Sequence, residues 1–341
     1  MTKTILFASI FLLFVGLTLN SCKKDEEVEP ALTGLDAAKK DYDDNYLGTK
    51  AIPIGWTGAT SGCLAGSISQ TVQNNVIKRV NYYRRLVGLP DNVTLNSSQN
   101  QKCQEAALYM VANRTITHYP SAGGTCYTAG AADAAGHGNL AVSNGYSELD
   151  ANHSVNAVSG YIEDPGANNL AVGHRAWILF PQLSAMGTGS AFNPADNNWT
   201  ANCLMWGDNM NGAAPTIDFV AYPPANYIAS SLLFPRWSFS IQGADFNGAT
   251  VSMTNASGAN IQCNVIHKSA STGGAPDARI AWEPDPSMTG NITGDTEFNV
   301  TVSNIGGITK TSYSYTVKVF YVTSTAKRIA SQEGFKEFLS L

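Results

Sequence analysis

Apolar and polar positions follow two different periods along the chain, and the change of period divides it into parts. Near the start, Val72, Val76, Val80 and Tyr83 recur every three or four residues, which predicts an amphipathic helix. The sequence Gly88-Leu89-Pro90 follows, and a glycine with a proline behind it is typical of the end of a helix.

A second helix is expected from Ser97 or Ser98, either of which suits the N-cap position, to Val111. The chain then leaves this helix through polar residues and reaches His118. The end of this helix therefore determines where His118 lies in the fold.

The apolar residues 177–180, which are closed by Pro181, predict a short buried strand. His174 and Arg175 would then stand at the edge of that strand. The edge of a buried element is a suitable place for a functional site.

From about Ala221 the period changes to two, and glycine-rich turns separate the runs. The expected strands are 237–241, 249–253, 261–265, 279–282, 298–302 and 313–321. Short strands at this spacing predict an antiparallel β-sandwich of immunoglobulin-like type. Trp237 and Trp282 would suit either its core or stacking on a sugar. The tail, residues 326–341, is expected to form a short amphipathic helix.

Residues 1–22 have the pattern of a targeting segment and do not belong to the fold. Lys3 precedes an uncharged apolar run, and small residues lead to Cys22. This segment resembles a bacterial lipoprotein signal, in which Cys22 would carry the lipid, although an ordinary secretory signal stays open. Residues 23–50 are expected to be a flexible tether. Their first residues, 23–27, resemble a tag for the outer face of the outer membrane, or are a solvated spacer.

Composition favours a folded protein outside the cytosol. The chain is 44% hydrophobic and 14% charged with a net charge of -5, so no nucleic-acid partner is indicated. The expected location is the cell envelope, as an outer-membrane lipoprotein that faces the surface or the periplasm. Besides Cys22, the cysteines are Cys63, Cys103, Cys126, Cys203 and Cys263. Two disulfides and one unpaired thiol are expected in an oxidising compartment, with the connectivity left open, and no pair has zinc-site spacing.

Several short pieces occur in an order that points to a family. They are Asn81-x-x-Arg84-x-x-x-Gly88-Leu89-Pro90, Ala106-Ala107-x-x-Met110, Thr117-His118, Gly138-Asn139-Leu140-Ala141, Gly173-His174-Arg175-x-x-Ile178-Leu179 and Met186-Gly187-x-Gly189. Together they resemble the CAP superfamily, whose SCP domain is shared by cysteine-rich secretory proteins, venom antigen 5 and pathogenesis-related proteins of class 1. The resemblance implies an α-β-α sandwich, here within residues 51–220, and the β-sandwich would take residues 221–325. The fold class is thus α+β.

The resemblance also implies a cleft in which two histidines and two acidic residues hold a divalent metal. His118 and His174 match the histidines, and Asp164 or its neighbour Glu163 matches one acidic residue. The other acidic position holds Gly138, so that carboxylate is missing unless His137 substitutes as a ligand.

Two imidazoles and a carboxylate would suit Zn(II) with one open position, at which bound water could become a nucleophile. A purely structural alternative also fits. His174 would hydrogen-bond the turn around Asn139, and Asp164 would pair with Arg175. Tyr119 is a candidate for lining a neighbouring apolar groove.

Three classes of function stay open. The first is a lipid-anchored binding module for a lipid, a peptide or a surface protein. The second is a metal-dependent hydrolase, with His118, His174 and Glu163 or Asp164 as catalytic residues. The third is an adhesion protein that acts through the β-sandwich. The missing carboxylate at Gly138 favours the first over the second, because a hydrolase needs a general base.

Overall fold

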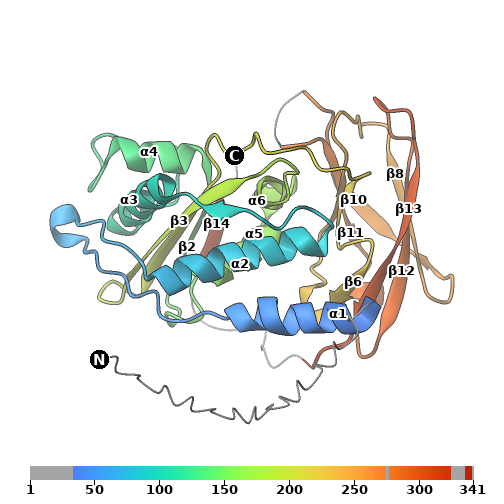
Figure 1. Cartoon of the computed structure of the whole chain (residues 1–341), viewed down its shortest axis with the longest axis horizontal. Coiled ribbons are helices and arrows are strands. Elements are labelled where there is room, and N and C mark those ends of the chain that lie inside the picture. The colour runs from blue at the N-terminus through green and yellow to red at the C-terminus, as the bar shows by residue number, and fades with distance from the viewer. Residues whose placement is uncertain (1–33, 273–275, 324–334, 340–341) are drawn as a thin grey trace, which may run out of the picture. The chain divides into compact units, whose positions relative to one another are not determined.

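A computed structural model describes residues 34–272, 276–323 and 335–339 (Figure 1). These residues lie in one unit that runs from Thr33 to Leu341. Cys22, the targeting segment and most of the tail fall outside the described residues. The expectations for them stay predictions.

The two long helices form where the apolar period predicts them. Helix α2, Gln70–Leu86, begins at the N-cap Ser69, whose side chain accepts from the amide of Val72. Helix α3, Ser97–Asn113, is capped by Asn96, one residue before the expected caps, because the Asn96 side chain accepts from the amide of Gln99. The remaining α-helices are α1 (Gly34–Asp41), α4 (Ala129–Gly136), α5 (Ser154–Glu163), α6 (Gly173–Ile178) and α7 (Pro286–Thr289).

The first sheet has the strand order β1-β3-β4-β2-β14. Its strands are β1 (Thr94–Leu95), β2 (Gly138–Asn144), β3 (Ala185–Asn193), β4 (Trp199–Met205) and β14 (Phe335–Leu339). Helices α3 and α4 pack on one face, and α2 and α5 lie on the other, which gives three layers (Figure 1). The predicted α-β-α sandwich is confirmed.

Side chains alternate across this sheet, so that each face has its own core. Leu140 and Val142 of β2 lie in the core beneath α3 and α4, whereas Ala141 between them lies in the core on the opposite face. This second core continues without a break into the C-terminal sheets, where it includes Trp237 and Trp282. The two folded parts therefore share apolar packing.

Two further sheets form the C-terminal part, with orders β10-β11-β7-β5 and β6-β13-β12-β8-β9. Their strands are β5 (Val220–Tyr222), β6 (Tyr227–Ala229), β7 (Trp237–Ser240), β8 (Thr250–Asn255), β9 (Asn260–Ile261), β10 (Cys263–Lys268), β11 (Arg279–Pro284), β12 (Thr296–Ser303) and β13 (Tyr313–Phe320). Trp237 of one sheet meets Phe298 of the other edge to face at 5.7 Å. The predicted β-sandwich is confirmed, but it is not antiparallel throughout, because β6 pairs in parallel with β13. Trp237 and Trp282 are fully buried, so they belong to its core and offer no sugar-stacking face.

Three local expectations are wrong. Trp177 belongs to helix α6 and not to a strand, because the backbone of residues 173–178 closes helical hydrogen bonds and a short apolar run does not distinguish the two. Residues 34–49, expected in the tether, are helical, and Tyr42 packs edge to face against Phe320 of β13. Residues 335–339 are not helical but pair antiparallel with β2 and so extend the first sheet.

Among the described residues, no helix is both long and apolar enough to cross a bilayer.

Candidate functional site

The segment that carries the second predicted histidine forms a buried polar network. His174 sits in the first turn of α6, and its Nδ1 lies 2.7 Å from Oδ1 of Asp164. Neither side chain has any exposed surface. The other carboxylate oxygen of Asp164 accepts from the backbone amide of Arg175 at 3.3 Å. Both oxygens of Asp164 therefore hold the start of α6 in place.

Tyr161 of α5 and Asn139 of β2 complete this network. The ring of Tyr161 stacks on the imidazole of His174 with centroids 5.2 Å apart. The Tyr161 hydroxyl donates to the side-chain oxygen of Asn202 at 2.8 Å. The side-chain amide of Asn139 donates to the backbone oxygen of His174 at 3.0 Å. Residues from α5, α6 and two central strands are thus joined through the histidine segment.

His118 contacts a different part of the chain, helix α4. It follows α3, it is 5% exposed, and its Nδ1 lies 2.5 Å from the backbone oxygen of Ala135 in α4. Tyr119, next to it, is 81% exposed.

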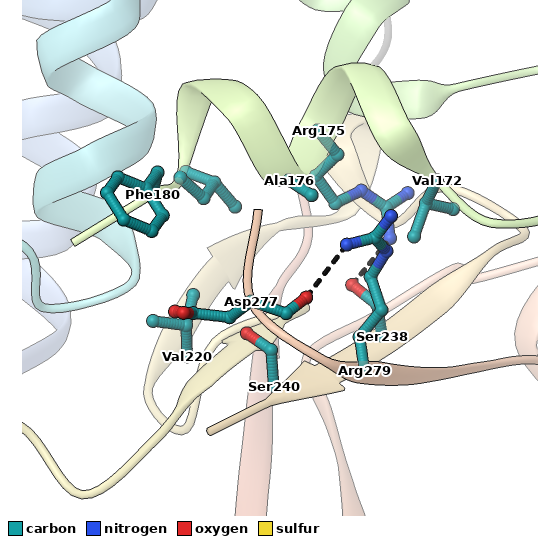
Figure 2. A pocket seen from close by; sticks show the side chains of 10 residues that line it. Val172, Arg175, Ala176, Phe180, Val220, Ser238, Ser240, Asp277 and Arg279 are labelled. Atoms are coloured by element: carbon teal, nitrogen blue, oxygen red, sulfur yellow. Dashed lines mark hydrogen bonds between the residues drawn. The ribbon is translucent and has the colours of Figure 1, made fainter. Parts of the chain in front are cut away.

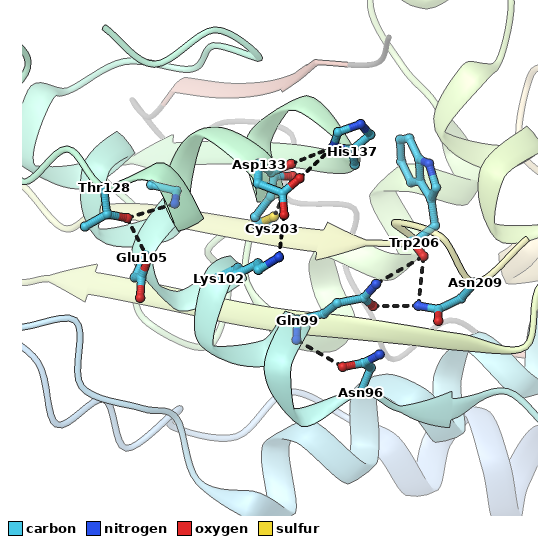
Figure 3. A network of polar contacts seen from close by, with 12 residues as sticks. Asn96, Gln99, Lys102, Glu105, Thr128, Asp133, His137, Cys203, Trp206 and Asn209 are labelled. Atoms are coloured by element: carbon cyan, nitrogen blue, oxygen red, sulfur yellow. Dashed lines mark hydrogen bonds and ion pairs between the residues drawn. The ribbon is translucent and has the colours of Figure 1, made fainter. Parts of the chain in front are cut away.

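His137 lies on the surface. Its Nδ1 is 3.0 Å from Oδ1 of Asp133, one turn earlier in α4, and Lys102 of α3 donates to the other oxygen of Asp133 at 2.5 Å. Lys102 holds the pKa of the Asp133 carboxyl below its usual range. Figure 3 shows this chain of contacts between α3 and the end of α4. His137 therefore takes part in a surface network with Asp133 and Lys102, and its role as a substitute ligand stays a prediction.

Position 138 has no room for the acidic side chain that the family carries there. A Cβ built on Gly138 would lie 2.7 Å from the backbone oxygen of Ala134 and 3.1 Å from Sγ of Cys203. Helix α4 thus rests directly on the start of β2. Only a glycine permits this approach.

The metal ligand set implied by the family does not fit these residues. Within residues 34–272, 276–323 and 335–339, no group of three or more His, Cys, Asp or Glu side chains could hold an ion. Asp164 is engaged by His174 and Arg175, and Gly138 supplies no ligand. The roles assigned to His118, His174, Glu163 and Asp164 as ligands or catalytic residues therefore stay predictions, and no reaction step is derived from them.

A family model for the cysteine-rich secretory protein family, CAP, matches residues 77–203. This segment is a CAP domain. The match covers α2 to β4, and hence the three-layer core together with His118 and His174. No curated protein matches the chain.

The β-sandwich is joined to the CAP domain by arginines that bind the carbonyl groups around Asp164. Arg175 of α6 donates to the carbonyl of Ile162 at 2.7 Å and to the hydroxyl of Ser238 in β7 at 2.9 Å. Its guanidinium also lies over the ring of Tyr222, 4.8 Å from the centroid. Burial lowers the pKa of Arg175 to about 10, so it still carries its charge at neutral pH.

Two arginines come from the sandwich side. Arg236 donates to the backbone oxygen of Asp164 at 2.6 Å, and its Nε donates to Glu283 at 3.0 Å. Arg279 of β11 donates to the carbonyl of Ala171 at 2.5 Å. We call Arg175, Arg236 and Arg279 the arginine clamp. Sequence reasoning missed Arg236 and Arg279, because nothing in their local sequence shows which carbonyls they will meet.

A small cavity remains at this junction. It has a volume of about 20 Å³, and residues of α6, β7 and β11 line it together with Asp277. Figure 2 shows Arg175 reaching Ser238, and Arg279 reaching the backbone oxygen of Asp277. Burial raises the pKa of the Asp277 carboxyl to about 6, and the nearby charge of Arg279 opposes this shift. The cavity has room for about one water molecule.

A groove lies between α2 and the edge strand β1. Its volume is about 470 Å³, within the usual range of ligand sites, whereas a second groove beside α3 has about 200 Å³. Ile77, Val93 and Leu95 give the larger groove apolar lining, and Asn74 and Thr94 are exposed at its rim. Sequence reasoning did not single out this groove, since its residues belong to no motif with a known chemistry.

Proposed function

We propose that this protein is an exported, lipid-anchored CAP-domain protein that works as a binding module at the cell envelope. The observation that supports a binding role over a catalytic one is the complete burial of the His174 and Asp164 side chains. Both side chains are fully buried, and the segment around them is fixed to the β-sandwich by the arginine clamp. Because neither side chain has any exposed surface, we assign both groups a structural role within the proposed function.

A binding role then requires a different surface, and the groove between α2 and β1 is the best candidate. β1 is the edge strand of the first sheet, and it pairs on its inner side with β3. On its outer side, the Asn81 side chain donates to the carbonyl of Val93 at 2.9 Å and accepts from its amide at 3.1 Å. Asn81 thus makes the same pair of bonds that a neighbouring strand would make.

Leu95 lies two residues further along β1, and its peptide groups face the same side as those of Val93, because strand geometry repeats every two residues. An extended peptide could continue the pairing there and place its side chains against Ile77 and Leu95. The ligand class that we propose is therefore a short extended peptide segment.

The groove is tested with a library of random twelve-residue peptides displayed on phage and selected on the purified chain. Selected peptides are expected to bind the native chain and to lose about tenfold or more in affinity with Asn74→Arg or Thr94→Arg, which place a long charged side chain at the rim. Gln101→Arg, at the smaller groove beside α3, is the matched control. Failure to select any peptide, or equal effects of all three variants, would contradict the assignment of the groove.

The anchor is tested separately, because it concerns a part of the chain outside the described residues. Radiolabelled palmitate is expected to label the chain in a bacterial host and to move it to the membrane fraction. Cys22→Ala is expected to abolish both results. Labelling that survives this substitution would overturn the anchor and leave the peptide groove untouched.

A further inference from the structure

Two cysteines face each other in the core between the first sheet and helices α3 and α4. Cys103 lies in α3 and Cys203 in β4, and both are fully buried in the same apolar cluster. Among the described residues a disulfide joins Cys63 to Cys126, whereas the sulfur atoms of Cys103 and Cys203 are not bonded to each other in this structure.

Gly189 shows how closely the two cysteines approach. A Cβ built on Gly189 of β3 would lie 2.4 Å from the carbonyl carbon of Cys103, so α3 rests directly on β3 at this point. Gly189 is also the direct cross-strand partner of Cys203. Paired residues in neighbouring antiparallel strands have Cα atoms about 4.5 to 5.5 Å apart. The backbones of Cys103 and Cys203 are therefore neighbours across the contact of helix and sheet.

The two thiols also interact directly. Burial raises the pKa of the Cys203 thiol well above its usual value, and a hydrogen bond with the thiol of Cys103 raises it further. Cys203 has a second weak contact, 3.6 Å from Sγ to the backbone oxygen of Ala134. Thiols that contact each other need only small side-chain rotations to reach the bonding distance of about 2.05 Å.

We propose that Cys103 and Cys203 form a second disulfide when the chain folds in an oxidising compartment. Two S–H bonds break and one S–S bond forms. The two protons and two electrons pass to an oxidant of the protein-disulfide class, which is reduced to a dithiol. The exchange occurs before α3 closes on the sheet, because both sulfur atoms are inaccessible in the folded chain.

The position of Cys263 argues against the other pairings. Cys263 begins β10 in the sandwich, and its sulfur lies 3.6 Å from the carbonyl of Ile261. It packs against the core on the opposite face of the first sheet from Cys103 and Cys203. A bond from Cys263 to either of them would have to cross that sheet, so Cys263 is the unpaired thiol.

Peptide mapping of the full chain tests this pairing. The protein is exported to an oxidising compartment of an expression host, alkylated with iodoacetamide under denaturing conditions without reductant, digested and analysed by mass spectrometry. A linked peptide that contains Cys103 and Cys203 is expected, together with alkylated Cys263. The Cys63–Cys126 link in the same digest is the internal control for oxidation. Alkylated Cys103 and Cys203 beside an intact Cys63–Cys126 link, or a link to Cys263, would overturn the proposal.

Thermal unfolding gives a second, independent readout. In the variant Cys63→Ala with Cys126→Ala, reduction by dithiothreitol in concentrated urea, followed by refolding with dithiothreitol present, is expected to lower the unfolding midpoint by about 5 to 10 °C, because the proposed bond closes a loop of about 100 residues. Adding Cys103→Ala and Cys203→Ala is expected to remove this response to reductant. A midpoint that does not respond in the first variant counts against the bond.

Discussion

The guanidinium of Arg236 donates to the backbone oxygen of Asp164 at 2.6 Å, while the carboxylate of the same aspartate holds Nδ1 of His174 at 2.7 Å. A residue of the β-sandwich therefore fixes the residue that orients the buried histidine of the CAP domain. Because the sandwich and the CAP domain also share an apolar core, we expect them to unfold together.

Removal of the Arg236 side chain tests this link. Arg236→Ala is expected to lower the free energy of unfolding by about 2 to 3 kcal/mol, since a charged donor to buried carbonyl groups is lost. Urea denaturation followed by tryptophan fluorescence measures the change. Arg114→Ala is the control, because Arg114 pairs with Asp196 but is 64% exposed, and it should change stability by no more than about 0.5 kcal/mol. Equal losses of unfolding free energy in both variants would show that Arg236 does not stabilise the protein more than an exposed arginine does.

Adding a side chain at position 138 should damage the fold and not restore a metal site. Gly138→Ala is expected to destabilise the protein by about 1 to 3 kcal/mol, because its Cβ meets the backbone oxygen of Ala134 at 2.7 Å. Gly123→Ala is the matched control, since Gly123 is exposed and a Cβ there meets nothing within 4 Å. Thermal unfolding compares the two, and a neutral Gly138→Ala would refute the close contact with α4.

Zinc binding should not depend on His118. In calorimetric titrations with Zn²⁺, the native chain and His118→Asn are expected to give the same heats, because the ring of His118 is held at the carbonyl of Ala135. His137→Asn controls for weak binding at the surface, where His137 pairs with Asp133. One-to-one binding that is lost only in His118→Asn would restore the metal-site hypothesis.

Asp277 should make stability depend on pH. Burial raises its pKa in the folded state from 3.8 to about 6, so the folded state binds the proton more tightly than the unfolded state does. Below about pH 3 the carboxyl is neutral in both states and carries no penalty, whereas above pH 6 the folded protein bears the full cost of a buried charge.

Asp277→Asn removes that cost. The variant is expected to be more stable than the native chain by about 1 to 2 kcal/mol at pH 8, and this advantage should vanish near pH 3, below the pKa of the unfolded state. Denaturant unfolding at several pH values measures it. Glu297→Gln, at an exposed position in β12, is expected to show no such pH-dependent gain. A constant difference across the pH range would mean that Asp277 titrates normally.

The thiol of Cys263 should react slowly in the folded chain. Burial raises its pKa to about 11, so only a small fraction is thiolate at neutral pH. Alkylation of Cys263 by iodoacetamide, followed by mass spectrometry of its peptide, is expected to speed up about tenfold for each pH unit between 7 and 10. In concentrated urea the same thiol should react near its ordinary rate. A fast reaction in the folded chain at pH 7 would contradict the burial of the sulfur.

Local sequence was sufficient wherever one element decides its own structure. The spacing of Val72, Val76 and Val80 predicted α2, because residues three and four apart share a helix face. The alternation of apolar and polar residues predicted the strands of the sandwich, because alternate residues of a strand share a face. The order of the short family pieces indicated the CAP domain, which the family model confirms over residues 77–203.

Only the tertiary structure decided what the site residues do. The sequence showed Gly138 in place of a carboxylate, but only the fold brings Sγ of Cys203 in β4 to 3.1 Å from the position that a Cβ on Gly138 would take. Likewise, Arg236 and Arg279 meet carbonyls of a loop more than 60 residues away. Such contacts depend on how separate elements pack, and the local periodicity of the sequence does not predict that packing.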